Sequence, residues 1–324
     1  MLVSILLFLL GFALLIKGGD WFVDGSVGIA HRFHLPELLI GATVVSIGTT
    51  LPEVMVSSQA AIEGNAGISY GNAIGSVICN TSLIAAITVA VRPGKVNPKS
   101  FLLPTVFFFG AAATYSILAW TMGRFDRWIG VLFLTVFAVY MVWSTLHMKK
   151  HPELAEDDGE PEEESKPKPL WLEIVLLVIG AAAIALGARL LVDNGTLIAA
   201  ALGVPDSVIG LTMVALGTSL PELITAITSL IKGHGALSLG NVIGANLFNI
   251  VLVSGAAITI SPFAIPAEKT IAGINSSLIV DIPVMLLVMS ILCIPALLGG
   301  KLKRWQGVLL LGLYVAFTAY QFIV

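Results

Sequence analysis

The sequence turns on one stretch, Gly41-Ala42-Thr43-Val44-Val45-Ser46-Ile47-Gly48-Thr49-Thr50-Leu51-Pro52-Glu53, which lies inside a long apolar run. It recurs downstream as Gly210-Leu211-Thr212-Met213-Val214-Ala215-Leu216-Gly217-Thr218-Ser219-Leu220-Pro221-Glu222. Each copy places one carboxylate beside hydroxyl groups and a proline, at a depth where hydrocarbon is expected outside the protein. An ionisable side chain at that depth is costly and by default marks a functional site. Two such carboxylates, in two copies of one segment, indicate a divalent-cation site in a membrane transporter.

The composition of the whole chain agrees with a membrane protein. Of its 324 residues, 57% are hydrophobic and 11% are charged, and the mean hydropathy is +0.96. These values are typical of a polytopic membrane protein and exclude an ordinary soluble domain. A spanning helix needs about 20 mostly apolar residues. On that rule we predict an all-α fold with ten spans, at residues 2–30, 36–62, 68–91, 101–120, 128–147, 170–200, 205–231, 236–260, 275–297 and 305–323.

The loops between these spans predict the orientation. The loops that follow the odd-numbered spans carry twelve Lys and Arg residues, whereas the other side of the membrane carries three. Basic loops face the cytoplasm, so we expect a multi-pass plasma-membrane protein with both termini outside the cell. The polar stretch 149–169 holds eight acidic residues and several prolines. We interpret it as a disordered cytoplasmic tether, with calcium sensing as the alternative.

The two halves of the chain form a repeat. A single constant offset aligns them without a gap, so that Asp24 meets Asp193 and Glu53 meets Glu222. The same offset pairs residues 71–80 with residues 240–249. Each half contains five spans, an odd number, so the second half enters the membrane from the opposite side. Inverted repeats are characteristic of secondary transporters with a site at the midplane, although duplication alone does not prove transport. We divide the chain into a first repeat (1–148), an acidic linker (149–169) and a second, inverted repeat (170–324).

The chemistry of the repeated stretch favours a hard cation. On a helix, Ser46, Thr50 and Glu53 fall on one face within two turns. Pro52 has no N–H, so the carbonyl of Gly48 loses its partner and becomes available, and Pro221 should act in the same way in the second copy. Oxygen ligands of this kind suit Ca²⁺ and Na⁺. No histidine or cysteine joins the motifs, which argues against Zn²⁺ or Cu⁺. An H-E-x-x-H pair, which a zinc protease would need, is also missing from the sequence.

Several polar residues admit a second interpretation. Asn80 and Asn249 occupy equivalent positions in the two repeats, where they either line the cation site or form hydrogen bonds between helices. Glu53 and Glu222 could be members of buried ion pairs, but spans two, three, seven and eight carry no basic residue at comparable depth. We therefore expect these four side chains to contribute to the ion site. The two cysteines of the chain lie in apolar runs and are expected to be free buried thiols.

The pattern G-T-[ST]-L-P-E followed by G-N-x-I-G-x-x-x-x-N, in two inverted copies, resembles the sodium/calcium exchangers of the cation/calcium antiporter superfamily. The likeness covers nearly the whole chain. It implies exchange of about three Na⁺ for one Ca²⁺ by alternating access, with spans one and six sliding against the other eight. It also implies that Glu53 and Glu222 bind either ion. The other ligands that it implies are the backbone carbonyls of Thr49 and Thr218 for calcium, the hydroxyls of Thr50 and Ser219 and the carbonyls of Ser46 and Ala215 for sodium, and the side chains of Ser76 and Asn80.

Two positions depart from the pattern of this family. Ala245 stands where the prokaryotic members often have serine, so one sodium position loses a hydroxyl. Asn249 stands where many relatives have aspartate, which makes potassium dependence unexpected. With two carboxylates, one Ca²⁺ neutralises the site and about three Na⁺ leave one positive charge, so exchange should be electrogenic. The proton-coupled branch is the alternative, although its members usually carry additional glutamates in the third and eighth spans.

Two other classes of protein compete with a transporter. A cation channel also places carboxylates at the midplane, but channels usually build rings around an axis. An intramembrane enzyme would need a nucleophile–base pair or metal-ligand histidines, which the motifs do not offer. We expect no enzymatic activity, no cofactor and no nucleic-acid partner. We expect instead a monomer in the lipid bilayer whose ligands are the transported Ca²⁺ and Na⁺ ions.

Overall fold

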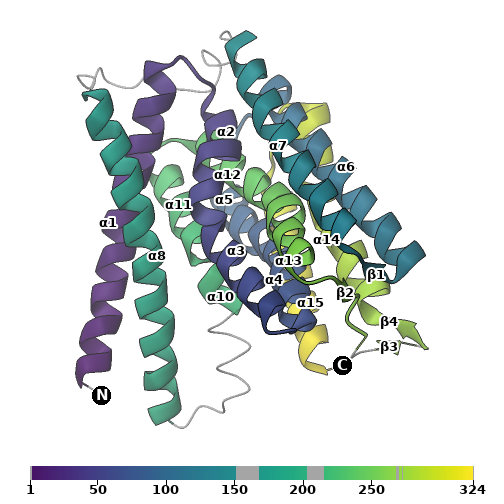
Figure 1. Cartoon of the computed structure of the whole chain (residues 1–324). Coiled ribbons are helices and arrows are strands. Elements are labelled where there is room, and N and C mark those ends of the chain that lie inside the picture. Colours follow the sequence, from purple (N-terminus) through teal and green to yellow (C-terminus); the bar gives the residue numbers. More distant parts are fainter. Residues whose placement is uncertain (1, 151–167, 203–214, 268–269, 272, 324) are drawn as a thin grey trace.

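The structure is a computed structural model that describes residues 2–150, 168–202, 215–267, 270–271 and 273–323. It is nearly all helical (Figure 1). Several helix ends follow directly from local sequence. Side-chain oxygens of Ser, Thr, Asp and Asn commonly cap the first turn of a helix. The Asn65 side chain accepts a hydrogen bond from the Ile68 N–H at 3.2 Å and so caps one helix. Asn97 caps another by accepting from the Lys99 N–H at 2.9 Å. The same helix ends at Gly123, whose φ of 63° is the left-handed conformation that glycine favours at helix ends.

In the first half, the helices form five membrane-spanning segments. Two of these are interrupted by a wider, π-helical turn. The segments are α1 (Leu2–Arg32), α2–η1–α3 (Glu37–Ile40, Gly41–Val45 and Ser46–Ile62), α4–η2–α5 (Ala66–Cys79, Asn80–Ala85 and Ala86–Val91), α6 (Pro98–Met122) and α7 (Arg127–Lys150).

The second half repeats this order from the opposite side. Short antiparallel strand pairs form in the described loops: β1 (Arg124–Phe125) of the first half pairs with β2 (Phe263–Ala264) of the second, and β3 (Thr270–Ile271) pairs with β4 (Ile274–Asn275). The helical segments are α8 (Leu170–Ala201), α10–α11 (Ala215–Thr218 and Leu220–Ile231), α12–η5–α13 (Gly235–Phe248, Asn249–Val253 and Ser254–Ile260), η6–α14 (Ser277–Asp281 and Ile282–Gly299) and α15 (Arg304–Ile323).

The predicted spans agree with these helices to within a few residues. Eight described helices are long and apolar enough to cross a membrane, α15 is a helix of 20 residues, and the seventh span is described only from residue 215 onward. Both ends of the chain lie at one end of the molecule, whereas α7 ends and α8 begins at the other (Figure 1). The predicted fold of two inverted five-helix repeats is therefore confirmed. The acidic stretch 151–167 lies outside the described residues, so the proposed domain boundaries stay a prediction.

Helices α1 and α8 pack against each other along their length and stand to one side of the other helices (Figure 1). Small residues allow this close approach. A Cβ at Gly11 would lie 2.8 Å from the Gly187 carbonyl oxygen, and a Cβ at Gly187 would lie 2.7 Å from the Gly11 oxygen. A large apolar core joins the remaining helices, and a second, smaller apolar cluster connects the α1/α8 pair to them. We call those remaining helices, α2–α7 and α10–α15, the body.

Within the described ranges, π-helical turns interrupt the spans at η1, η2 and η5, and a further one, η6, begins the segment that continues as α14. Such turns are rare and frequently occur at functional sites. Two of them are related by the repeat, because η2 begins at Asn80 and η5 begins at Asn249, which is the repeat partner of Asn80. The repeat therefore preserves a local distortion of the helix as well as the residue that begins it. Both cysteines, Cys79 and Cys293, are buried and free, as predicted.

Candidate functional site

The two repeated glutamates are fully buried in the centre of the protein. Glu53 lies on α3, one residue after Pro52, and Glu222 lies in the first turn of α11, one residue after Pro221. Both have an exposed fraction of 0%. They are close enough for their charges to repel each other. Two buried carboxylates in an apolar protein need a compensating positive charge, since an unpaired buried charge costs several kcal/mol.

Nothing in the described part of the chain supplies that charge. None of the four carboxylate oxygens of Glu53 and Glu222 has a hydrogen-bond partner among the described residues. Buried polar atoms are normally satisfied, so a group of unsatisfied ones calls for a bound ion or water. Other predicted ligands belong to the same class of buried atom without a partner in the described ranges. These are the hydroxyls of Thr50 and Ser219, both polar atoms of the Asn80 amide and Oδ1 of Asn249.

The repeats cross at this point. The π-helical turn η2, which begins at Asn80, packs against α11 and therefore faces the helix of Glu222. The turn η5, which begins at Asn249, packs against α3 and faces the helix of Glu53. Each amide thus lies on a segment that contacts the carboxylate-bearing helix of the other repeat. The arrangement collects oxygen atoms from both halves of the chain around one buried centre.

Hydrogen bonds fix the first copy of the motif against α12. The Ser46 hydroxyl donates to the Gly41 carbonyl oxygen at 2.7 Å and lies 3.0 Å from that of Asn241. The Thr49 hydroxyl donates to Oδ1 of Asn241 at 3.1 Å and also faces the Glu222 carboxylate. These hydrogen bonds hold the backbone of Ser46 and Thr49, whose carbonyls are the predicted ligands, against α12.

Two asparagines that the sequence analysis gave no role take part in this arrangement. Asn241 accepts the hydrogen bonds of the first motif. Its repeat partner Asn72 donates through Nδ2 to the Glu53 carbonyl oxygen at 3.2 Å and to the Ser57 hydroxyl at 2.9 Å. Their position in the repeated G-N-x-I-G pattern was a signal that could have identified them. Both hold the backbone beside a carboxylate or a predicted carbonyl ligand.

The position of Asn249 shows how a neutral amide is oriented. Its Nδ2 donates to the carbonyl oxygen of Ala245 at 3.0 Å, which turns Oδ1 away as a free acceptor. Ala245 is fully buried and its carbonyl accepts this bond, while Ser76 is buried on α4. The described residues contain no group of three or more His, Cys, Asp or Glu side chains that could hold a metal ion. Two carboxylates surrounded by neutral oxygens form a donor set that fits Ca²⁺ or Na⁺.

The second copy of the motif has a different backbone from the first. Ala215 and Thr218 begin and end the short helix α10, and the chain then breaks at Ser219 before α11 starts at Leu220. Pro221 lies at the start of α11, where its missing N–H needs no helical partner, and the helix is interrupted at Ser219, in the turn where Pro221 was expected to act. The break exposes backbone oxygens in a different way, and Thr218 is only half-buried.

Comparison with known proteins agrees with this geometry. One family profile, described as sodium/calcium exchanger protein, matches residues 3–146 and 172–323. The sodium/calcium exchanger MaX1 of Methanosarcina acetivorans is 32% identical over 355 aligned positions that cover 99% of each chain. The putative antiporter CaxA of Alkalimonas amylolytica is 36% identical over 100% of this chain and 99% of its own.

A solved structure is similar over the whole fold. The sodium-calcium exchanger NCX_Mj, soaked with 2.5 mM Na⁺ and 10 mM Sr²⁺, superimposes with a TM-score of 0.80 and 34% identity, covering 98% of both chains. The profile, the relatives and the structure all cover nearly the full length. The structural match also agrees with the inverted-repeat fold. The chain therefore belongs to the sodium/calcium exchanger family.

Proposed function

We propose that this member of a cation/calcium antiporter family exchanges about three Na⁺ for one Ca²⁺ by alternating access, and that the exchange is electrogenic. The observation that carries the proposal is the pair of fully buried glutamates, one from each inverted repeat, whose oxygens lack partners among the described residues. In this proposal Glu53 and Glu222 bind Ca²⁺ or Na⁺, but not both at once. The remaining ligands are those of the family pattern: Thr49, Thr218, Thr50, Ser219, Ser46, Ala215, Ser76, Asn80 and Asn249, with Ala245 lacking the serine hydroxyl.

The charge of the site explains both competition and coupling. One Ca²⁺ balances the two carboxylates, whereas a single Na⁺ leaves one carboxylate charge buried and unpaired, which is costly. Several Na⁺ must therefore enter together before the protein can rearrange without Ca²⁺. If about three do so, the loaded site carries one more positive charge than the calcium form, and each cycle moves that charge across the membrane.

The neutral side-chain amides of Asn80 and Asn249 affect how readily the site releases a bound ion. Asn80 and Asn249 provide oxygen ligands without adding negative charge, so that the site binds a divalent ion but can release it. We propose that the protein works as a monomer in the plasma membrane, with its basic loops and acidic linker in the cytoplasm and both termini outside. The excess of Lys and Arg in the loops of one side supports that orientation.

Calcium uptake into proteoliposomes tests the function. Vesicles that contain purified protein and internal Na⁺ are diluted into Na⁺-free buffer with Ca²⁺ at constant pH. We expect uptake that requires internal Na⁺ and that responds to an imposed membrane potential. Asp126→Asn is a matched control, because it converts an exposed loop carboxylate, paired with Arg124, into an amide in the same way as a site variant would.

A proton-coupled antiporter is the second candidate. The observation that favours it is that two buried carboxylates can carry two protons in place of one Ca²⁺. Such an exchange is electroneutral, so uptake would depend on an outward proton gradient and would ignore the imposed potential. Uptake with these two properties and without any need for Na⁺ would overturn the sodium proposal.

A further inference from the structure

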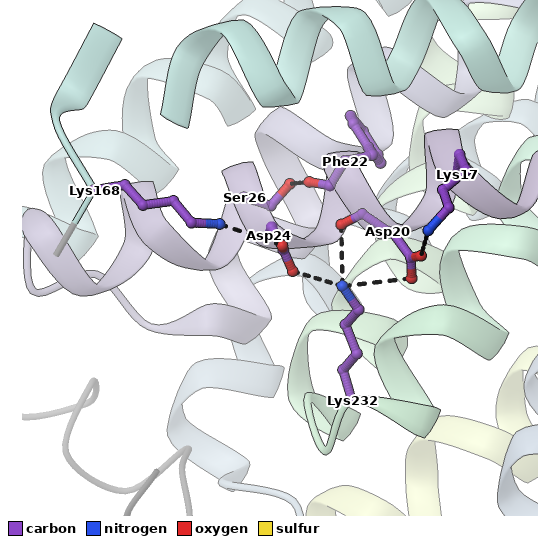
Figure 2. Close-up of polar contacts among 7 residues, drawn as sticks. All are labelled: Lys17, Asp20, Phe22, Asp24, Ser26, Lys168 and Lys232. Atoms are coloured by element: carbon purple, nitrogen blue, oxygen red, sulfur yellow. Dashed lines mark hydrogen bonds and ion pairs between the residues drawn. The ribbon is translucent and has the colours of Figure 1, made fainter. Parts of the chain in front are cut away.

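A group of charged residues joins the α1/α8 pair to the body (Figure 2). Lys232, which directly follows α11, places its Nζ 2.6 Å from Oδ1 of Asp24 and 3.5 Å from Oδ1 of Asp20, both on α1. The same Nζ donates to the Asp20 carbonyl oxygen at 3.2 Å. We call Asp20, Asp24 and Lys232 the linker-side triad, because they lie toward the end of the molecule where the linker joins α8.

The sequence repeat generates a second group. It relates Asp20 to Arg189, Asp24 to Asp193 and Lys232 to Glu63. We call Arg189, Asp193 and Glu63 the terminus-side triad. Each triad contains two carboxylates and one cation, but the cation stands on the body in one and on the α1/α8 pair in the other. The signs are exchanged at two of the three positions, Asp20 with Arg189 and Lys232 with Glu63, so each triad offers one pair of opposite charges between the α1/α8 pair and the body.

The two triads are in different states in this structure. In the linker-side triad the cation bridges the pair and the body, and the Lys232 side chain is only 26% exposed. In the terminus-side triad Arg189 instead contacts Asp193 of its own helix at 3.6 Å, with side chains 81% and 61% exposed. Glu63 accepts a hydrogen bond from Gln59 at 2.6 Å. The described residues contain no ion pair between Arg189 and Glu63.

Further charged contacts hold the pair together, and one reaches the body, because Nε2 of His31 on α1 lies 3.5 Å from Oε1 of Glu37 on α2. Arg32 of α1 contacts Glu173 of α8 at 3.0 Å, and Lys168, which shortly precedes α8, contacts Asp24 at 3.4 Å. Together with the glycine contacts, the interactions of Arg32 and Lys168 hold α1 and α8 to each other. The pair can therefore move as one unit, and a charged contact between the pair and the body at either end can decide its position.

We propose that the two triads are alternative latches, and that Lys232 and Arg189 are positioning residues for the exchange reaction. In an inverted repeat, the second transport state arises when the two repeats exchange conformations. Helix α8 then takes, relative to α3, the place that α1 now has relative to α11. Arg189 reaches Glu63 while Lys232 leaves Asp20 and Asp24. The proposal rests on the alternating access argued above.

The matched composition of the triads has an energetic consequence. Breaking one latch is compensated by forming the other, so neither state is trapped. Each latch involves partly exposed charges, and such pairs are weak and screened by salt. Loss of one latch should therefore shift the balance of states by about threefold to tenfold, without unfolding the protein.

Labelling of a buried cysteine reads this balance directly. Val27 lies three residues after Asp24 and is buried in the small apolar cluster between the pair and the body. In full-length Val27→Cys protein in nanodiscs, a water-soluble maleimide should react slowly, and faster whenever the linker side opens. Protein without this substitution gives the background from Cys79 and Cys293, which are buried. Ala30→Cys, also buried on α1, is a second reporter in case the first does not fold.

The two latches should act with opposite signs. Lys232→Gln should raise the labelling rate about threefold to tenfold, whereas Glu63→Gln and Arg189→Gln should lower it by a similar factor. Lys232→Arg keeps the charge and should change the rate by less than about twofold. General loosening of the structure would raise the labelling rate in every variant. The proposal is therefore overturned if all variants change the rate in the same direction. It is also overturned if Glu63→Gln and Arg189→Gln leave the rate unchanged.

Transport separates this proposal from the proposed function. The latch variants leave all predicted ligands intact, so the ratio of Ca²⁺ to Sr²⁺ uptake should equal that of the parent while the rate changes. If the parent shows no sodium-dependent uptake but labelling responds with opposite signs, the assigned coupling fails and the latch stands. If the parent shows sodium-dependent uptake but no triad substitution changes the labelling rate, the latch proposal is refuted and the proposed function stands.

Discussion

The two copies of the glutamate motif have nearly the same sequence but different backbones. The first copy runs as one continuous segment, with a π-helical turn at Gly41–Val45 and then an α-helix from Ser46 that carries Pro52 in its interior. The second copy is broken at Ser219, and Pro221 begins a new helix. The glycine, a threonine and the proline have the same spacing in both copies, but Ser46, whose hydroxyl contacts Asn241, is replaced by Ala215 in the second copy.

The difference follows from where each copy packs. The first copy crosses α12 closely and is held by the hydrogen bonds of Ser46 and Thr49 to Asn241. The second copy lies beside α8 of the α1/α8 pair. One repeat is therefore held in a continuous form while the other adopts a broken one. An exchanger built from inverted repeats needs such an asymmetry, since two repeats of identical conformation would open both sides of the membrane equally.

The largest effect is expected from the two glutamate substitutions, which test whether both copies of the motif contribute equally to Ca²⁺ binding. Glu53→Gln and Glu222→Gln should each reduce Ca²⁺ uptake by more than about 100-fold, because each removes half of the charge that balances the ion. Sodium-driven ⁴⁵Ca²⁺ uptake measures this, with Asp126→Asn as the control. Substantial uptake in either variant would show that only one repeat supplies the essential carboxylate.

Acidification should affect both copies together. Protonation of either glutamate removes ligand charge, so uptake at fixed Na⁺ and Ca²⁺ gradients should fall as the pH is lowered and recover when it is restored. We expect a loss of about tenfold for each pH unit once protonation dominates. Uptake measured across a pH series, with equal pH on both sides of the vesicle, tests this. A rate that rises on acidification would contradict competition between protons and Ca²⁺.

The paired asparagines sharpen the comparison between repeats. Asn249→Asp loses the bond from Nδ2 to the Ala245 oxygen and places an acceptor against it, whereas Asn80 makes no such bond within the described residues. We therefore expect Asn249→Asp to destabilise the ion-free protein by about 1–3 kcal/mol more than Asn80→Asp does. Thermal unfolding in detergent without Ca²⁺ measures the difference. Equal losses would mean that this hydrogen bond does not distinguish the two repeats.

The smallest effect concerns the repeat-related threonines. Thr49→Val removes the hydrogen bond to Asn241 and should cost about 1 kcal/mol of stability. Thr218 is half-buried. Its replacement by valine should therefore cost only about 0.5 kcal/mol or less. Denaturation midpoints of the two variants provide the test. A larger loss for Thr218→Val would indicate that the second copy is held as firmly as the first.

Most of the fold could be predicted because membrane spans depend on length and apolarity, which are local properties. The ends of α3, α5, α8 and α13 agree closely with prediction. The buried position of the two glutamates was also predictable, since no basic residue accompanies them. The repeated pattern marks Asn72 and Asn241, but their hydrogen-bond partners could not be predicted from the sequence, because these depend on which helices cross. The break at Ser219 falls in the turn that Pro221 was expected to loosen, whereas α3 continues through Pro52, and the sequence did not predict that difference.

The π-helical turns at Asn80 and Asn249 also set the rotation of the helix before each turn relative to the helix after it. A turn that contains one additional residue rotates everything before it by about 100° relative to everything after it. Deletion of a single residue from Asn80–Ala85 would restore a regular helix and swing the Ser76 face of α4 away by more than a quarter of a revolution. Residues outside the deletion would keep their identities but lose their common centre. Length in these two short segments is thus as strict a requirement as residue identity.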